Sequence, residues 1–269
     1  MHADEDLLPQ SSENNTMKSK ENATCNVLWF SGMHELKVLY DPTSELKYNE
    51  DYSVALNSAT INAKDVFQPV LILGRYGLEN QNSTEHSKFG RWAEQKGAKV
   101  IYSPKLSFQE DVDHGLSNLF AKKLEPRYYH ARLQGPFLRL DIPKLMKEHN
   151  LFGLPNVCKN HVIYTDADVI FGNKINKDET QGLIKSMGDD VSAMHGRESG
   201  KHADIKNTSV MIMNADLFEQ DISKMLKHAK RSHSYPEHDQ KMLNNWRQNT
   251  TVPNNRFKML PMHYNWKPC

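Results

Sequence analysis

The most informative stretch of this chain is Val162-Ile163-Tyr164-Thr165-Asp166-Ala167-Asp168, where an apolar run leads directly into two aspartates. The apolar run predicts a buried strand, with Asp166 and Asp168 at its carboxyl end. Side chains two residues apart in an extended chain point to the same side, so the two carboxylates should face one site. Paired carboxylates suit Mg²⁺ or Mn²⁺, which also take oxygens from a substrate phosphate. Taken alone, the same pair is also typical of a solvated turn after an edge strand.

Short apolar runs alternate with helical patterns on both sides of this stretch. Strands are predicted at residues 27–30, 37–40, 69–73, 98–102, 162–164, 191–194 and 209–213, and helices at 52–63, 83–96, 112–123, 136–148, 215–229 and 237–247. This alternation predicts an α/β fold with a mostly parallel, Rossmann-like central sheet and helices on both faces. Ligands of such sheets bind at the carboxyl ends of the strands, so the chemistry should lie just after each strand.

Composition narrows the possible functions. The chain has 269 residues, with 34 Lys and Arg against 33 Asp and Glu, for a net charge of +1. A domain that binds nucleic acid through bulk charge is usually clearly basic, so that class of partner is disfavoured. No apolar run approaches the ~18 residues that a membrane span needs. Residues 1–24 are mostly polar and predict a disordered tail or stalk, and residues 25–269 are expected to form one domain.

The cysteines and glycosylation motifs bear on the compartment. Cys25, Cys158 and Cys269 form no CxxC pair, and their spacing favours three unpaired thiols. Sequons of the form N-x-S/T occur at residues 14, 22, 82, 207 and 249. The polar tail and the sequons favour a Golgi or secretory lumen. The missing apolar core of a signal peptide is equally compatible with a cytoplasmic protein.

A second motif precedes the aspartate pair, Phe137-Leu138-Arg139-Leu140-Asp141-Ile142-Pro143. Together the two motifs resemble family 8 of the retaining glycosyltransferases, the glycogenin-like group with the GT-A fold. In that family a Tyr-x-Arg-Leu-x-Ile-Pro helix precedes a strand ending in Leu-Tyr-x-Asp-x-Asp. The segments 207–214, 239–244 and 51–63 resemble further family elements, so the resemblance covers roughly residues 48–268.

The resemblance implies a single GT-A domain over residues 25–269, possibly truncated at its C-terminus. It also implies a metal-dependent enzyme that moves a hexose of the glucose or galactose class from a UDP-sugar to an unknown glycan, protein or small-molecule acceptor. Asp168 would be the direct ligand of Mn²⁺ or Mg²⁺, and Asp166 would reach the metal and the ribose. Arg139 lies in an otherwise apolar helical pattern, where a cation is either a surface residue or, as the resemblance implies, a contact of the donor.

The remaining roles also come from the resemblance. Asn207 would bind the donor, while Asp239 and Gln240 would be catalytic and lie nearest the reacting carbon. The family ends in His-x-x-Gly-x-x-Lys-Pro, which supplies a third metal ligand and a phosphate-binding lysine. Here His263 and Lys267 stand too close together and no glycine intervenes. Either the motif is compressed, with His263 on the metal and Lys267 on the diphosphate, or the true motif lies beyond a truncated end, which we favour.

Two other functions fit parts of the pattern. Ser209 stands where the family usually has glycine, so a degenerate fold that binds a sugar nucleotide or a partner without turnover is one alternative. A haloacid-dehalogenase-like phosphatase also places Asp-x-Asp after a strand. That chemistry needs the pair on the first strand with Thr or Val two residues on, whereas Ile170 stands at this position.

Overall fold

The computed structural model describes residues 25–35, 45–78, 82–83, 85–113, 134–196, 208–232, 239–248 and 256–261. The strands are β1 (Asn26–His34), β2 (Phe67–Gly74), β3 (Lys99–Ser103), β4 (Val157–Asp166), β5 (Ala193–His195), β6 (Val210–Asn214) and β7 (Phe257–Met259). The helices are α2 (Glu45–Asn62), α3 (Lys88–Gln95), α6 (Ile142–Glu148), α7 (Lys177–Met187), α8 (Ala215–Ser232) and α9 (Asp239–Gln248), with short 3-10 helices η1 (Leu138–Asp141) and η2 (Leu151–Gly153).

The described strands form one sheet in the order β3-β2-β1-β4-β6-β5-β7. Four of the six pairings are parallel, while β6 runs antiparallel to both β4 and β5. From β1 the chain builds β2 and β3 on one side and β4 on the other, so the order reverses between β1 and β4. The prediction of a mostly parallel α/β fold is confirmed, and the reversal marks the crevice where such sheets bind ligands.

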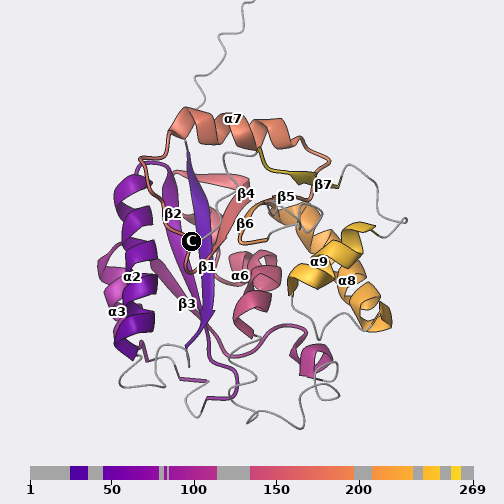
Figure 1. The fold of residues 1–269 in the computed structure, drawn as a ribbon, viewed down its shortest axis with the longest axis horizontal. Coiled ribbons are helices and arrows are strands. Elements are labelled where there is room, and N and C mark those ends of the chain that lie inside the picture. Colours follow the sequence, from indigo (N-terminus) through magenta and orange to yellow (C-terminus); the bar gives the residue numbers. More distant parts are fainter. Residues whose placement is uncertain are drawn as a thin grey trace, which may run out of the picture.

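Helices cover both faces of the sheet (Figure 1). Tyr164 of β4 faces a core built with η1, α6, α8 and α9, whereas Ile163 faces a core built with α2, α3 and α7. This alternation follows from the two-residue period of a strand. Because both faces are covered, the central strands read as continuous apolar runs, as expected for buried parallel strands.

Several element ends differ from the prediction for local reasons. The helix predicted from residue 83 begins at Lys88, because the Ser87 side chain caps it by accepting a hydrogen bond from Gly90 N. The helix predicted at 136–148 is divided: η1 ends at Asp141, and α6 begins at Ile142 with Pro143 in its first turn. Helix α7 was not predicted, although the Asn176 side chain caps it by accepting from two backbone N–H groups. The predicted strand at 37–40, most of the helix at 112–123 and the tail at 1–24 lie outside the described residues.

The prediction of unpaired thiols is wrong for two of the three cysteines. Cys25 and Cys158 form a disulfide with Cα atoms 4.9 Å apart. The strand register explains the bond, because Asn26 at the start of β1 lies opposite Val157 at the start of β4. A separation of 133 residues hides this neighbourhood from any rule based on local spacing. Cys269 lies outside the described residues.

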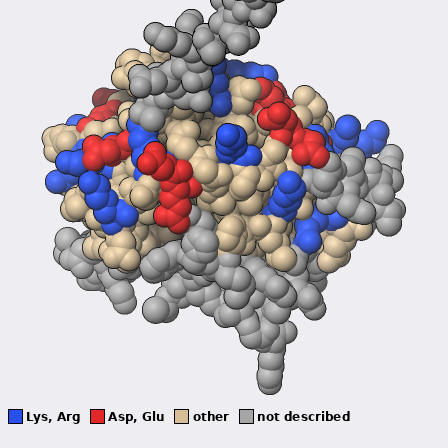
Figure 2. Space-filling model, turned by 90° about the horizontal axis from the view of Figure 1, so that it is seen from above, with Lys and Arg blue, Asp and Glu red and all other residues tan. Residues whose placement is uncertain are grey.

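The surface shows no single dominant charge on the face drawn in Figure 2. Lysines and arginines are interspersed with acidic residues there, and the described atoms form no broad basic stripe. This agrees with the balanced composition. In the part of the chain that the structure describes, no helix is both long and apolar enough to cross a membrane.

Candidate functional site

Asp166, the last residue of β4, is held by two donors at the reversal of the sheet. Arg139 Nη2 donates to Asp166 Oδ1 at 2.7 Å, and the Tyr164 hydroxyl donates to the same oxygen at 3.0 Å. The Asp166 side chain is 32% exposed, while that of Arg139 is 3% exposed. Since the two bonds meet at Oδ1, they set the orientation of the carboxylate. Asp166 is therefore oriented by buried neighbours and remains accessible to a ligand from solvent.

Arg139 is buried beneath the carboxyl end of β4. Its Nε donates to Pro136 O at 3.0 Å, its Nη1 donates to Thr208 O, and its guanidinium carbon lies 4.4 Å from the centre of the Tyr164 ring. Leu138 and Leu140 of η1 pack into the core on either side of it. A surface position for Arg139, one of the two expectations, is therefore wrong, because the structure buries it with acceptors around it. The contact with a donor stays a prediction.

Close packing between β1 and η1 makes this pairing possible. Gly32 of β1 lies opposite Asp166 in the register, and a Cβ atom on Gly32 would come within 3.2 Å of Leu138 Cβ. The missing side chain lets η1 approach the sheet closely enough to place Arg139 beneath the end of β4. A side chain at this position would therefore force Leu138 to shift by a few tenths of an ångström.

Asp168 lies just beyond the strand, in a turn. Val169 N donates to Asp166 O at 3.2 Å, and Asp168 is exposed. Carboxylates two residues apart share one side only in an extended chain, and the chain stops being extended at Ala167. Both aspartates nevertheless lie at the carboxyl end of β4, where the sequence placed them.

The segment that enters β6 contacts the same end of β4. Ser209 O accepts a hydrogen bond from Asp166 N at 2.8 Å, and Thr208 O accepts from Arg139. Asn207, which immediately precedes Thr208 and was predicted to contact the sugar donor, lies outside the described residues, as do His263 and Lys267. Asp239 and Gln240 are the first two residues of α9, so the predicted catalytic pair begins a helix packed on α8.

A second polar group, which the sequence did not reveal, lies at the carboxyl ends of β1 and β2. Buried Arg75 donates to both carboxylate oxygens of buried Glu35, at 2.5 and 3.3 Å, and its guanidinium stacks on Tyr102 at 3.6 Å. Arg75 also donates to the carbonyl oxygens of Ser83 and Glu85. Through these bonds Arg75 holds the backbone at residues 83 and 85 against the ends of β1 and β2. Arg75 and Glu35 are 40 residues apart, and no local pattern marks them.

Gln134 and Tyr76 belong to the same polar group at the carboxyl ends of β1 and β2. The Gln134 side chain accepts from Tyr76 N at 3.0 Å, and its buried Nε2 has no partner among the described residues. The Tyr76 hydroxyl donates to Asp113 at 2.6 Å. Burial, followed by the hydrogen bond and charge of Asp113 and the charge of Glu110, raises the pKa of Tyr76 to about 12. Tyr76 is therefore a neutral donor at physiological pH.

The donor atoms at the end of β4 fit a hard divalent cation. Asp166 and Asp168 offer carboxylate oxygens, the ligand type that Mg²⁺ and Mn²⁺ accept. Within the described ranges, no group of three His, Cys, Asp or Glu side chains is placed to hold a metal. A cation held by two aspartates would complete its shell with water and phosphate oxygens, as Mg²⁺ commonly does in phosphate sites.

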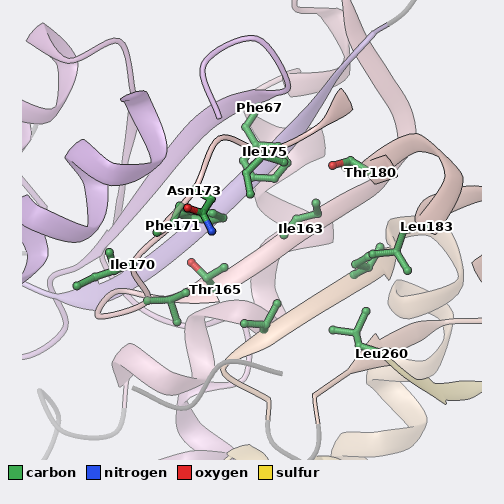
Figure 3. A pocket seen from close by; sticks show the side chains of 14 residues that line it. Phe67, Ile163, Thr165, Ile170, Phe171, Asn173, Ile175, Thr180, Leu183 and Leu260 are labelled. Carbon is green, nitrogen blue, oxygen red and sulfur yellow. The ribbon is translucent and has the colours of Figure 1, made fainter. Parts of the chain in front are cut away.

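The opposite face of the sheet carries an apolar cavity of about 130 Å³ (Figure 3). Ile163 and Thr165 of β4 form its floor, the segment 169–175 forms a wall, and Leu183 of α7 points into it. None of its lining residues is titratable. Because Thr165 and Asp166 point to opposite faces, the cavity is separate from the polar site and has no group for acid–base chemistry.

Comparison with known proteins identifies solved structures with a similar fold. Neither a protein-family model nor a curated protein sequence matches this chain. The apo crystal structure of mouse xyloside xylosyltransferase 1 superposes with a TM-score of 0.51, at 14% identity over 87% of this chain and 84% of that one. The glycosyltransferase GlyE of Streptococcus pneumoniae gives a TM-score of 0.49, at 16% identity over 90% of this chain and 46% of that one. The chain thus has a fold similar to that of a solved glycosyltransferase.

Proposed function

We propose that this chain is a glycosyltransferase that uses a nucleotide-diphosphate sugar and a divalent cation. The observation that supports the proposal best is the carboxylate of Asp166, oriented by Arg139 and Tyr164 at the reversal of the sheet order. Ligands of open α/β sheets bind at this place. The likeness to a glycosyltransferase fold adds support for the class of reaction.

The chemistry explains why carboxylates and a cation are needed. In transfer, the bond between the anomeric carbon of the sugar and a phosphate oxygen breaks, and the acceptor oxygen forms a bond to that carbon and loses its proton. Negative charge develops on the departing diphosphate. A cation held by Asp166 and Asp168 would stabilise this charge as it forms. Arg139 orients Asp166, and we propose Asp239 or Gln240 as the group nearest the reacting carbon.

The donor sugar has two candidate classes. The family resemblance points to retaining transfer of glucose or galactose from UDP. The similar mouse structure is a xyloside xylosyltransferase, which makes UDP-xylose a second candidate donor. All three donors carry the same diphosphate, so the proposed cation site does not distinguish them.

A binding protein without turnover is the second candidate function. Ser209, which replaces the usual glycine of the resembled family, has its carbonyl bonded to Asp166 N, so the departure lies at the site itself. The phosphatase alternative is disfavoured, because the aspartate pair follows β4 and not the first strand.

Release of UDP from UDP-glucose, UDP-galactose and UDP-xylose, with Mn²⁺ or with EDTA, tests the proposal. We expect slow hydrolysis of one donor with Mn²⁺ only, abolished by Asp168→Asn and retained by Asp65→Asn, whose exposed carboxylate precedes β2 at the other end of the sheet. UDP binding without turnover would favour the binding protein. Hydrolysis of p-nitrophenyl phosphate with no UDP binding would contradict the proposal in favour of a phosphatase.

A further inference from the structure

The disulfide is the first of two independent observations about where this chain matures. Cys25 and Cys158 join the amino ends of β1 and β4, and Gln181 of α7 donates to Cys158 Sγ at 3.5 Å and to Cys25 O at 3.2 Å. The bond therefore sits inside the packed fold, between two neighbouring strands and a helix. Such disulfides form and persist in oxidising compartments and are rare in reducing ones.

The second observation is an exposed sequon between β2 and α3. The sequence Asn82-Ser83-Thr84 matches the acceptor pattern for N-linked glycans, and Asn82 lies exposed in a turn. The neighbouring backbone is held from inside, because buried Arg75 donates to Ser83 O at 2.5 Å. In addition, Glu85 N donates to Ser83 Oγ at 3.0 Å. The backbone at Ser83 and Glu85 is thus held on its inner side, while Asn82 is exposed at the surface.

A glycan at Asn82 is compatible with the rest of the molecule. The loop follows β2, which is separated from β4 and Asp166 by β1 in the sheet order. The side chain of Asn82 makes none of the contacts that hold the Glu35–Arg75 ion pair. A bulky hydrophilic substituent there would extend into solvent without disturbing either polar group.

We propose that this chain matures in the lumen of a secretory pathway, where Cys25 and Cys158 are oxidised and Asn82 receives an N-linked glycan. A lumenal protein disulfide takes up the two electrons and two protons of the thiols. In the second step the amide nitrogen of Asn82 bonds to the anomeric carbon of a lipid-diphosphate-linked oligosaccharide. The bond from that carbon to the diphosphate breaks, and the amide nitrogen loses one proton.

Peptide mapping of the chain secreted from eukaryotic cells behind a cleavable leader tests both modifications. Trypsin releases residues 76–88, a peptide with a single sequon. Treatment with peptide-N-glycosidase F in H₂¹⁸O should convert Asn82 to ¹⁸O-labelled aspartate. Mapping without reductant should show the peptides of Cys25 and Cys158 joined.

Three variants separate the sequon from its surroundings. Asn82→Gln and Thr84→Ala should remove the glycan from peptide 76–88, and Asn80→Gln, two residues away and outside the sequon, should retain it. An unlabelled Asn82 or free thiols at Cys25 and Cys158 in the secreted parent would overturn the proposal. A chain that folds in the cytosol but aggregates in the secretory lumen would overturn it as well.

Discussion

The proposed cation site depends on single residues at the end of β4. One carboxylate oxygen of Asp166 accepts bonds from both Arg139 and Tyr164, so these two residues position the group that would hold the cation. A lone cation buried as deeply as Arg139 would be strongly destabilising, which means that the ion pair serves the fold as well as the site.

Replacing Arg139 by lysine separates charge from geometry. Lysine keeps the positive charge but cannot direct donors at Asp166, Thr208 and Pro136 together. We expect Mn²⁺-dependent UDP binding to weaken at least tenfold, of order 1.4 kcal/mol. Urea unfolding should show a loss of about 1–3 kcal/mol in the free energy of unfolding.

Arg91→Lys is the matched control, because Arg91 is exposed on α3. This variant should change neither the Mn²⁺-dependent affinity for UDP nor the free energy of unfolding. If Arg139→Lys bound UDP as tightly as the parent, the planar guanidinium of Arg139 would not be needed for UDP binding.

Tyr76 predicts a pH dependence at the other polar group. Its pKa is raised from 10.0 to about 12, so the folded state holds the phenol proton more tightly than the unfolded state. This contribution to stability is fully present below pH 10 and is lost as the pH rises through 12. Urea unfolding should find the parent more stable than Tyr76→Phe at about pH 8, with the gap narrowing by about pH 11. A gap that stays constant over this range would contradict the assignment.

Part of the geometry at the end of β4 could be predicted from the sequence. Asp166 and Asp168 were recognisable because a strand runs into them. The role of Arg139 beneath Asp166 was not, since its partner is 27 residues away and is reached only through the packing of η1 on Gly32. The Glu35–Arg75 pair and Gln134 left no sequence signal, because tertiary structure alone brings them together.

Among the elements, β1 and β4 are neighbours in the middle of the sheet, and a disulfide joins their amino ends. The bond closes a long loop of the unfolded chain, so its removal should lower the free energy of unfolding by about 2–5 kcal/mol. We expect the double variant Cys25→Ser/Cys158→Ser to unfold at a lower urea concentration and to lose this amount of the free energy of unfolding. Cys269→Ser, which leaves the bond intact, should unfold like the parent. Equal stability of the double variant and the parent would mean that the bond is absent in solution.

The packing of α7 over the sheet leaves the apolar cavity incompletely filled. Leu183→Phe adds apolar volume that can enter the space of about 130 Å³. It should raise the free energy of unfolding by about 0.5–1.5 kcal/mol, whereas Leu183→Ala should lower it by about 2 kcal/mol or more.

Ile61→Phe is the control for added apolar volume without a cavity, because Ile61 is 68% exposed. Thermal or urea unfolding should show no gain for it. Destabilisation by Leu183→Phe would show that the cavity cannot accept a ring.

Element prediction succeeded where the pattern was strong, namely a continuous apolar run for β2 and helical periodicity for α8 and α9. It missed α7, whose capping residue Asn176 and acidic first turn were the available signals. It also missed β7, a three-residue strand too short to show a period. Neither the antiparallel direction of β6 nor its insertion between β4 and β5 could be predicted, because an apolar run carries no sign of its direction or its neighbours.

At the scale of the whole molecule, the order of the strands decides where chemistry can occur. The sheet reverses between β1 and β4, and the end of β4 brings together η1, the turn after Asp166 and the segment entering β6. The α/β class was predictable from alternating apolar runs and helical patterns. The disulfide was not, since it depends on the register of strands far apart in the sequence.

The proposed site at the end of β4 is tested by calorimetric titration of the chain with UDP, in the presence and absence of Mn²⁺. The proposal is that the carboxyl end of β4 holds a cation and a nucleotide diphosphate together. It predicts binding that requires Mn²⁺ and is lost in Asp168→Asn, while Asp65→Asn binds like the parent and all three proteins unfold at the same urea concentration. UDP binding that is independent of Mn²⁺, or unchanged in Asp168→Asn, would contradict it.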